Sequence, residues 1–278
     1  MKFTKMHGCG NDYVYINGFQ EKIEDKAEFA RCVSDRHFGV GSDGAIFINP
    51  SDEADFEMEM YNADGTRAEM CGNGIRCVAK YVYDYGLTDQ TKISIASFHK
   101  IKYLDLTVEN GKVTKVRVDM GQPILDADQI PVVSQSEQVI HERIEVDGKE
   151  YKMTCVSMGN PHAIVFMDDV ANLQIEKIGP SFENHPRFPK RINTEFVKVI
   201  DSSYVEMRVW ERGTGETLAC GTGCCATVVA CVLNGRTDRK VTVKVLGGEI
   251  DIEWDEKTDH VFMTGPAATV FEGEFPWK

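Results

Sequence analysis

The chain has 278 residues, of which 42% are hydrophobic and 27% are charged, and its formal net charge is −13. These proportions are typical of a soluble globular protein, and the length suits one large domain or two of ordinary size. The negative charge argues against nucleic acid or an anionic membrane as a partner, because both bind to basic patches.

In the first half, hydrophobic alternation and turn signals predict short strands and two helices. Helices are expected over Asp25–Ser34 and from about Ile75 to Tyr85, where Gly86 ends the pattern. Turns rich in glycine and asparagine separate the other segments. The predicted strands are Lys2–Thr4, Tyr13–Ile16, Ala45–Asn49, Asp55–Tyr61, Lys92–Ala96, Ile101–Val108 and Val113–Asp119.

The second half repeats this order after a polar crossover with prolines, from Gln122 to Glu142. An apolar helix is predicted from about Cys224 to Leu233. Hairpin-like runs of strands around one principal helix favour an α+β fold over a doubly wound parallel sheet. The predicted strands are Met153–Ser157, Ala163–Phe166, Thr194–Ile200, Tyr204–Trp210, Val241–Val245, Glu249–Trp254 and Val261–Met263.

The two halves match when one is shifted by 149 residues without a gap. The strongest cluster is a cysteine followed by Gly-x-Gly, and the other matches keep the same phase, which indicates an internal duplication. The matched pairs are Cys71 and Cys220, Gly72 and Gly221, Gly74 and Gly223, Gly10-Asn11 and Gly159-Asn160, Phe47 and Phe196, and Glu57-Met58 and Glu206-Met207.

The duplication predicts two pseudo-symmetric domains, each a curved β-sheet or barrel around a central helix. We expect residues 1–121 to form the first and 122–264 the second, with the segment 265–278 returning to the first. A fold that supplies one cysteine from each half places two thiols on opposite sides of a cleft between the domains. We expect the active site in that cleft.

Nine cysteines and an N-terminus without signal-peptide features predict free thiols in a reducing compartment, the cytoplasm. No stretch approaches ~20 apolar residues, so no membrane span is expected. Cysteine spacings such as Cys71-x5-Cys77 and Cys220-x3-Cys224 lack the closely spaced pairs of structural zinc sites. We therefore predict no metal.

A cysteine at a helix start has a lowered pKa, because the first N–H groups lack partners and the helix dipole is positive there. Two such cysteines facing one carbon could remove a proton from one side and return it on the other. The N–H groups could also stabilise the charge that builds up on a substrate carboxylate. This pattern favours stereoinversion at the α-carbon of an amino acid, without a pyridoxal cofactor.

The segment Asn62-Ala63-Asp64-Gly65-Thr66, followed after four residues by Cys71-Gly72-Asn73-Gly74-Ile75-Arg76, resembles the signature of diaminopimelate epimerases. The family commonly has Ser at the position of Thr66. The resemblance covers essentially the whole chain. Further matching motifs are Gly10-Asn11-Asp12, Gly159-Asn160-Pro161-His162, Arg191-Ile192-Asn193-Thr194-Glu195, Trp210-Glu211-Arg212-Gly213 and Ala219-Cys220-Gly221-Thr222-Gly223.

The resemblance implies a cofactor-independent, homodimeric epimerase that interconverts LL- and meso-2,6-diaminopimelate for lysine and cell-wall synthesis. It implies that Cys71 and Cys220 are the acid and base, and that His162 and Glu211 adjust their proton affinities. Many members have Gln at the position of Gly44, so that side-chain contact is absent here. The implied substrate-binding residues are Asn11, Asn62, Asn160, Asn193, Glu211 and Arg212 by side chain, and Gly72, Asn73, Gly221 and Thr222 by backbone.

Three alternatives stay open at this point. The first is a racemase of the same fold for another amino acid, such as histidine or a hydroxyproline, which the absence of a side chain at Gly44 allows. The second is a redox protein in which Cys71 and Cys220 form a reversible disulfide, although such pairs usually occur as C-x-x-C. The third is a non-catalytic binding module, for which two thiols have no purpose.

Overall fold

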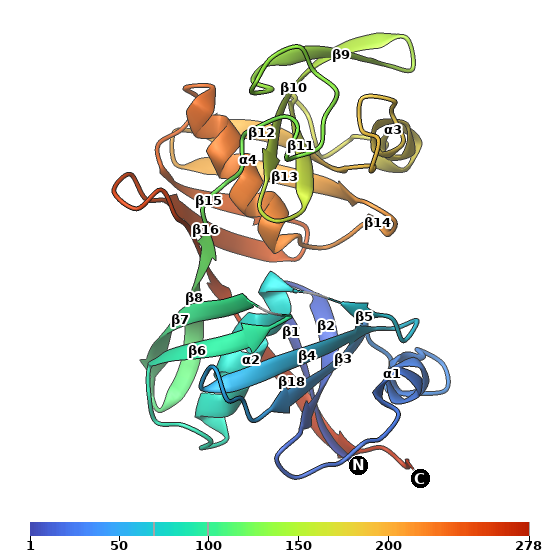
Figure 1. The fold of residues 1–278 in the computed structure, drawn as a ribbon, viewed down its shortest axis with the longest axis vertical. Helices are drawn as coiled ribbons and strands as arrows, with labels where there is room; N and C mark the ends of the chain where they lie inside the picture. Colours follow the sequence, from blue (N-terminus) through green and yellow to red (C-terminus); the bar gives the residue numbers. More distant parts are fainter. Residues whose placement is uncertain (69, 99, 278) are drawn as a thin grey trace. The chain divides into compact units, whose positions relative to one another are not determined.

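The computed structural model describes residues 1–68, 70–98 and 100–277. Its contacts divide the chain into two compact units. The first unit comprises Met1–Val118 and the terminal segment from Thr264, and the second comprises Asp119–Met263 (Figure 1). Residue 278, the end of the predicted segment 265–278, lies outside the described residues.

The first unit is a mixed sheet with two helices, α1 (Lys26–Ser34) and α2 (Gly72–Asp84). Strand β1 lies between β2 and β18, antiparallel to both. The pairs β2–β3 and β4–β6 are parallel, and α1 and α2 respectively provide their crossovers. The strands are β1 (Lys2–Gly8), β2 (Asn11–Asn17), β3 (Gly44–Asn49), β4 (Phe56–Asn62), β5 (Arg67–Ala68), β6 (Lys92–Ser97), β7 (Lys100–Glu109), β8 (Lys112–Gly121) and β18 (Ala268–Glu274).

The second unit repeats this plan with helices α3 (Ile175–Glu183) and α4 (Gly221–Leu233). Strand β10 is antiparallel to both β9 and β11, and the pairs β11–β12 and β13–β15 are parallel. The strands are β9 (Glu142–Val146), β10 (Lys149–Ser157), β11 (Pro161–Phe166), β12 (Asn193–Asp201), β13 (Tyr204–Glu211), β14 (Gly215–Glu216), β15 (Lys240–Val245), β16 (Gly248–Trp254) and β17 (Val261–Pro266).

The predicted α+β fold with an internal duplication is confirmed. A shift of 149 residues carries both ends of α1 onto α3 and both ends of α2 onto α4. The parallel pairs and their crossovers recur at the same places in both units.

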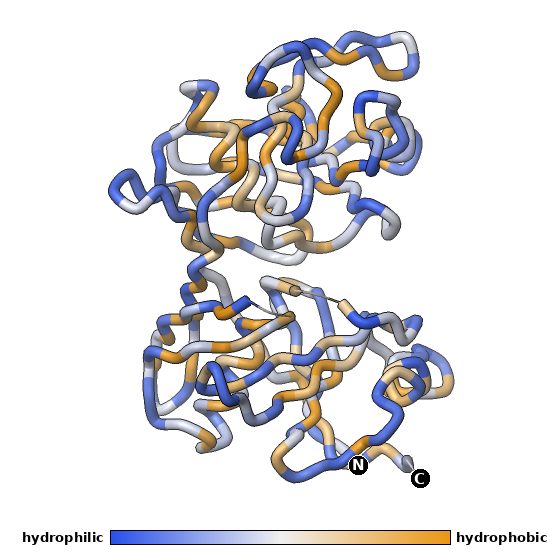
Figure 2. The backbone as a smooth tube through the Cα atoms, in the orientation of Figure 1, coloured by the Kyte–Doolittle hydropathy of each residue, from blue (hydrophilic) through white to orange (hydrophobic). Residues whose placement is uncertain are grey.

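Each unit is organised around one buried helix. In α4 nearly every residue from Gly221 to Cys231 is buried, and in α2 the run from Gly72 to Ala79 is buried without interruption. Helix α2 packs against β1, β2 and β7, whereas α1 packs against β2, β3 and β4. Strands β2 and β3 are buried along most of their length, as expected when helices cover both faces of a sheet. Figure 2 shows hydrophobic residues on α4 and the inner strands and hydrophilic residues on the turns.

Three expectations about the elements were wrong in detail. The strands do not come only in hairpin-like runs, because four strand pairs are parallel across helices. Both central helices begin three residues earlier than predicted, since a cysteine caps each of them and glycines form the first turn. Finally, β5, β9, β14, α3 and β18 were not predicted. Among the described residues, no helix is long and apolar enough to cross a membrane.

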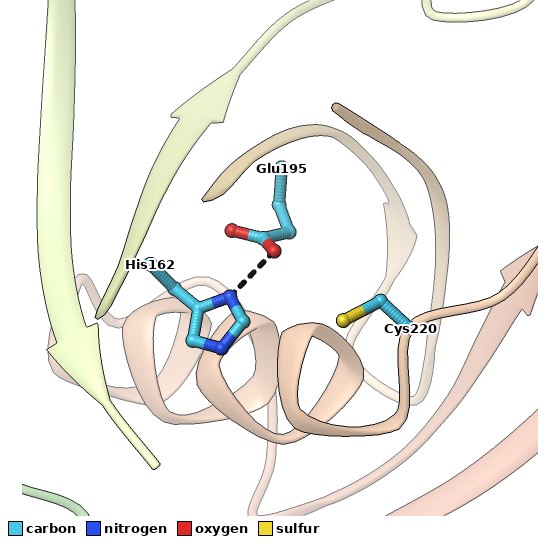
Figure 3. A group of neighbouring side chains, drawn as sticks. All are labelled: His162, Glu195 and Cys220. Carbon is cyan, nitrogen blue, oxygen red and sulfur yellow. Dashed lines mark hydrogen bonds and ion pairs between the residues drawn. The ribbon is translucent and has the colours of Figure 1, made fainter. Parts of the chain in front are cut away.

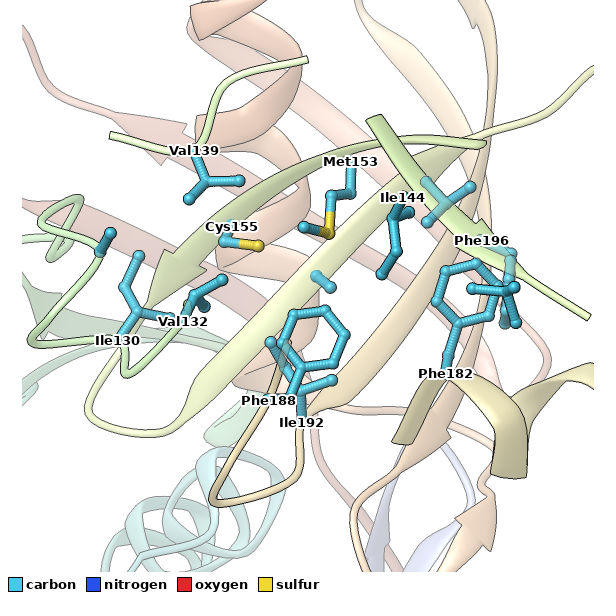
Figure 4. Close-up of a cluster of buried hydrophobic side chains, with 14 of the residues drawn as sticks. Ile130, Val132, Val139, Ile144, Met153, Cys155, Phe182, Phe188, Ile192 and Phe196 are labelled. Carbon is cyan, nitrogen blue, oxygen red and sulfur yellow. The ribbon is translucent and has the colours of Figure 1, made fainter. Parts of the chain in front are cut away.

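The second unit has a large hydrophobic core cluster between its sheet and α3 (Figure 4). Phe182 of α3 and Phe196 of β12 are fully buried and lie edge to face, with ring centroids 5.4 Å apart. Phe196 is the duplication partner of Phe47, which is also buried in the first unit. The same position of the repeat therefore supplies an aromatic core residue to both units.

We predict that Phe196→Ala lowers the free energy of unfolding by about 3–5 kcal/mol, because it opens a cavity in this core. Phe38→Ala is the matched control, since the Phe38 side chain is 91% exposed. The control is expected to change stability by no more than about 0.5 kcal/mol. Urea unfolding followed by circular dichroism measures both variants. Equal losses in the two variants would contradict the assignment of Phe196 to the core.

Candidate active site

Each central helix begins immediately after a cysteine. Cys71 precedes α2 and Cys220 precedes α4, both with extended backbone conformation (φ −132° and −118°). The Cys71 sulfur accepts the backbone N–H of Gly74 at 3.2 Å, and the Cys220 sulfur accepts that of Gly223 at 3.4 Å. Because these N–H groups have no partner within the helix and lie at its positive end, they favour a thiolate or a bound carboxylate.

The last glycine of each motif is required by close packing. A Cβ atom on Gly74 would lie 2.7 Å from Cδ1 of Ile46, and one on Gly223 would lie 2.6 Å from Oε1 of Glu195. Both distances are shorter than real Cβ contacts. The Gly-x-Gly sequence therefore lets the first helical turn lie directly against the neighbouring strand.

In the first unit, Asn11 lies against the Cys71 thiol. The Cys71 S–H donates to Oδ1 of Asn11 at 3.1 Å, and Nδ2 of Asn11 donates to Oδ2 of Asp43 at 2.8 Å. Arg36 donates in turn to Oδ1 of Asp43 at 2.9 Å. Because the amide NH2 is bound to Asp43, the amide oxygen faces the sulfur.

The first turn of α2 is held by a buried arginine. Arg76 has no exposed surface, and its Nη1 donates to the Gly72 carbonyl at 3.1 Å. Its Nη2 donates to Oδ1 of Asn73 at 2.9 Å, and its Nε donates to the Pro266 carbonyl at 3.2 Å. The guanidinium therefore orients two of the predicted substrate-binding residues, Gly72 and Asn73.

Two other predicted positions lie near the ends of β3 and β4. Asn62 donates from Nδ2 to Oγ1 of Thr66 at 3.0 Å, within the turn that follows β4. At Gly44, a Cβ atom would lie 2.1 Å from the Tyr61 carbonyl oxygen and 2.9 Å from the Tyr13 ring. A side chain at Gly44 would therefore require the backbone at Tyr61 to shift.

In the second unit, His162, Glu195 and Cys220 converge on one another (Figure 3). His162 and Glu195 are fully buried, and Nδ1 of His162 lies 2.7 Å from Oε1 of Glu195. Nε2 of His162 lies 3.1 Å from Oδ1 of Asn160. The structure thus links the predicted residues His162 and Asn160 to each other and brings His162 next to the predicted catalytic thiol.

Burial raises the pKa of the Cys220 thiol well above its ordinary value, and the carboxylates of Glu211 and Glu195 raise it further. The Thr222 hydroxyl and the N–H of Gly223 act in the opposite direction, because they stabilise the thiolate. Oγ1 of Thr222 lies 3.5 Å from the sulfur. In this structure Cys220 is therefore favoured as a thiol.

The remaining predicted residues of the second unit form a short network near the end of β13. Asn193 donates from Nδ2 to the Pro161 carbonyl at 2.8 Å and accepts the backbone N–H of Arg212 at 2.9 Å. The exposed Arg212 side chain donates from Nη1 to the Lys190 carbonyl at 3.1 Å. Glu211 accepts a hydrogen bond from the Thr217 hydroxyl.

Among the described residues, His162, Glu195 and Cys220 form the one group whose side chains could together hold a metal ion. The separation of 2.7 Å between the His162 nitrogen and the Glu195 oxygen is a hydrogen-bond distance. Two ligand atoms at ~2.0–2.1 Å from one tetrahedral zinc ion lie more than 3 Å apart. The geometry is therefore that of a hydrogen-bonded pair, and we assign no ion to it.

Sequence reasoning missed three residues that contact the predicted ones: Asp43 beside Asn11, Arg76 beside Asn73, and Glu195 beside His162. Glu195 carries only a weak signal, since it follows two polar residues and directly precedes the apolar pair Phe196-Val197 in β12. A buried charge in a strand needs a partner. That signal does not say which partner.

Solved structures share the fold at low sequence identity. A PhzF-family phenazine biosynthesis protein from Bacillus anthracis has a TM-score of 0.69 at 15% identity, covering 100% of this chain and 99% of that one. A hydroxyproline epimerase from Agrobacterium vitis has a TM-score of 0.68 at 14% identity, covering 98% of this chain and 90% of that one. These matches concern the fold alone.

Sequence relatives are much closer. A diaminopimelate epimerase from Agathobacter rectalis is 62% identical, with 99% of each chain covered. One from Acetivibrio thermocellus is 60% identical, covering 99% of this chain and 98% of its own. Residues 3–125 and 154–270 match the diaminopimelate epimerase family as a whole. The chain therefore belongs to the diaminopimelate epimerase family.

Proposed function

We propose that this protein interconverts LL- and meso-2,6-diaminopimelate by proton transfer between the substrate α-carbon and two thiols, Cys71 and Cys220. The observation that carries the proposal is the repeated cap: in each unit a cysteine sulfur lies at the start of the central helix and accepts the N–H of the third residue after it. Membership of the family supplies the substrate.

The reaction needs one thiolate and one thiol. The thiolate takes the α-proton and becomes a thiol, and the electron pair left on carbon is delocalised into the α-carboxylate. The opposite thiol then gives its proton to the other face of the carbon and becomes a thiolate. No atom is gained or lost, and the two sulfurs exchange protonation states. The reverse reaction uses the same groups in exchanged roles.

The helix starts are suited to the reacting carboxylate. N–H groups at the first turns of α2 and α4, from Gly72 and Asn73 and from Gly221 and Thr222, are fixed by the fold before substrate arrives. Donors held in this way stabilise developing negative charge without reorganisation during the reaction. N–H donors from both helix starts would therefore hold the carboxylate as its charge increases.

The rest of the substrate carries two ammonium groups and a distal carboxylate. We assign the distal carboxylate to the planar guanidinium of Arg212, which can donate two parallel hydrogen bonds. The amides of Asn11, Asn62, Asn160 and Asn193 can donate and accept without adding charge. Glu211 can pair with an ammonium group. We assign to His162 and Glu211 the adjustment of the proton affinity of Cys220, which is supported by the proximity of His162 and the charge of Glu211.

The nine free thiols support a reducing compartment, and we place the protein in the cytoplasm. On the family resemblance we also propose a homodimer. Sedimentation equilibrium tests this assembly, because a single species at the chain mass of 31.2 kDa would contradict it.

An assay in deuterated water tests the reaction. With LL-diaminopimelate under reducing conditions, we expect deuterium at the α-carbon and formation of the meso isomer, both followed by NMR. Cys71→Ser and Cys220→Ser are each expected to lower turnover by at least about 100-fold, because a hydroxyl is a far weaker acid and base. Cys32→Ser, a partly exposed cysteine outside both motifs, is the control.

Near-full turnover in either active-site variant would rule out the two-thiol mechanism. A racemase for another amino acid would give exchange only with that substrate. A redox protein would give no exchange.

Replacement of Arg212 tests the distal contact. Arg212→Lys keeps the charge but loses the bidentate geometry, so KM for diaminopimelate should rise about tenfold or more. Stability should not change, because the side chain is exposed. Arg143→Lys, another exposed arginine of the same unit, is the control and should leave KM unchanged. An unchanged KM in Arg212→Lys would remove this residue from the binding site.

A further inference from the structure

The two halves of the duplication differ in the charge of the residues that lie beside the two thiols. A shift of 149 residues places His162 on Tyr13 and Glu195 on Ile46. Ile46 packs beside Gly74 at the start of α2, as Glu195 packs beside Gly223 at the start of α4. The Cys220 motif therefore has a carboxylate where the Cys71 motif has a hydrocarbon side chain.

Glu195 is held with little freedom. Its side chain has no exposed surface, and its Oε1 lies 2.7 Å from Nδ1 of His162, so the ionised carboxylate requires a proton on that nitrogen. Its second oxygen, Oε2, is buried and has no hydrogen-bond partner among the described residues. Burying a carboxylate with one oxygen unsatisfied costs free energy, and native structures keep such groups where they have a role.

The ligand atoms of Glu195, His162 and Cys220 all lie within 4.8 Å of one another. At that distance a fixed negative charge opposes a second negative charge on sulfur. The neutral Ile46 exerts no such effect beside Cys71. The exchange at this position of the repeat therefore gives Cys220 a charged neighbour that Cys71 does not have there.

We propose that Glu195 is a positioning residue that holds His162 by its Nδ1 proton and keeps Cys220 protonated, so that Cys220 donates the proton in the direction in which Cys71 is the base. The role of Cys220 as proton donor rests on the proposed function.

Other groups around Cys220 act together with Glu195. Glu211 also raises the pKa of the thiol, whereas the Thr222 hydroxyl and the Gly223 N–H lower it. Of the two carboxylates, Glu211 accepts a hydrogen bond from the Thr217 hydroxyl, and Glu195 is bound to His162. The variants below change Glu195 alone and leave the other groups in place.

The test measures the alkylation of individual cysteines by iodoacetamide as a function of pH, with peptide mass spectrometry to separate Cys220 from Cys71. Glu195→Gln removes the charge at nearly constant shape. Glu195→Ile removes it by installing the residue found at Ile46, which provides a second charge-free variant if the first does not fold. Glu195→Asp keeps the charge and is the matched control.

We expect the pH midpoint of Cys220 alkylation to fall by about one unit or more in the charge-free variants, the size of shift that a neighbouring charge causes. The Cys71 midpoint should not move, and Glu195→Asp should stay near the wild-type midpoint. An unmoved Cys220 midpoint, equal shifts at both cysteines, or an equal fall in Glu195→Asp would each overturn the proposal.

The outcome is independent of the assay for epimerisation. If the wild-type protein fails to epimerise diaminopimelate while the Cys220 midpoint still falls, the proposed function is wrong and the effect of Glu195 on the thiol stands. If epimerisation is present and the midpoint does not move, this inference alone is wrong.

Discussion

A hydrogen bond from a backbone N–H to a cysteine sulfur ties the chemistry of each unit to its fold. It requires a helix that begins immediately after the cysteine, and a glycine at the third position so that the strand beneath can approach. It also requires a helix buried on almost all sides, so that its start cannot move. The strands of each unit pack against that helix, so the packing of the core also determines the position of the sulfur.

The duplication supplies two copies of this arrangement, but their surroundings differ. Beside Cys71 lies the amide of Asn11, and the buried guanidinium of Arg76 binds Gly72 and Asn73 in the first turn of α2. Beside Cys220 lie Glu195 and His162. An inversion needs one acid and one base at any moment, and the different neighbours are a means of distinguishing the two thiols.

Much of this was accessible from the sequence, because the two cysteine motifs and the shift between them are local patterns. The predicted starts of the central helices lie one turn too far along the chain, because Cys is not a usual cap and glycine disfavours helix. Helix α3 was missed because Gly179 and Pro180 interrupt its pattern, although shifting α1 by 149 residues would have located it. Strand β18 is mostly exposed and pairs with β1 at the opposite end of the chain, so it has no local signal. The partnership of Glu195 with His162 likewise depends on the pairing of β11 and β12.

The sulfur caps are tested most directly by NMR of the backbone amides of Gly74 and Gly223 in the 15N-labelled protein as a function of pH. If each amide donates to its cysteine, its resonance will shift as that thiol loses its proton, and the shift will vanish in the matching Cys→Ala variant while the other glycine still titrates. A Gly74 resonance that does not respond to pH, or either resonance still titrating after its own cysteine is replaced, would contradict the account.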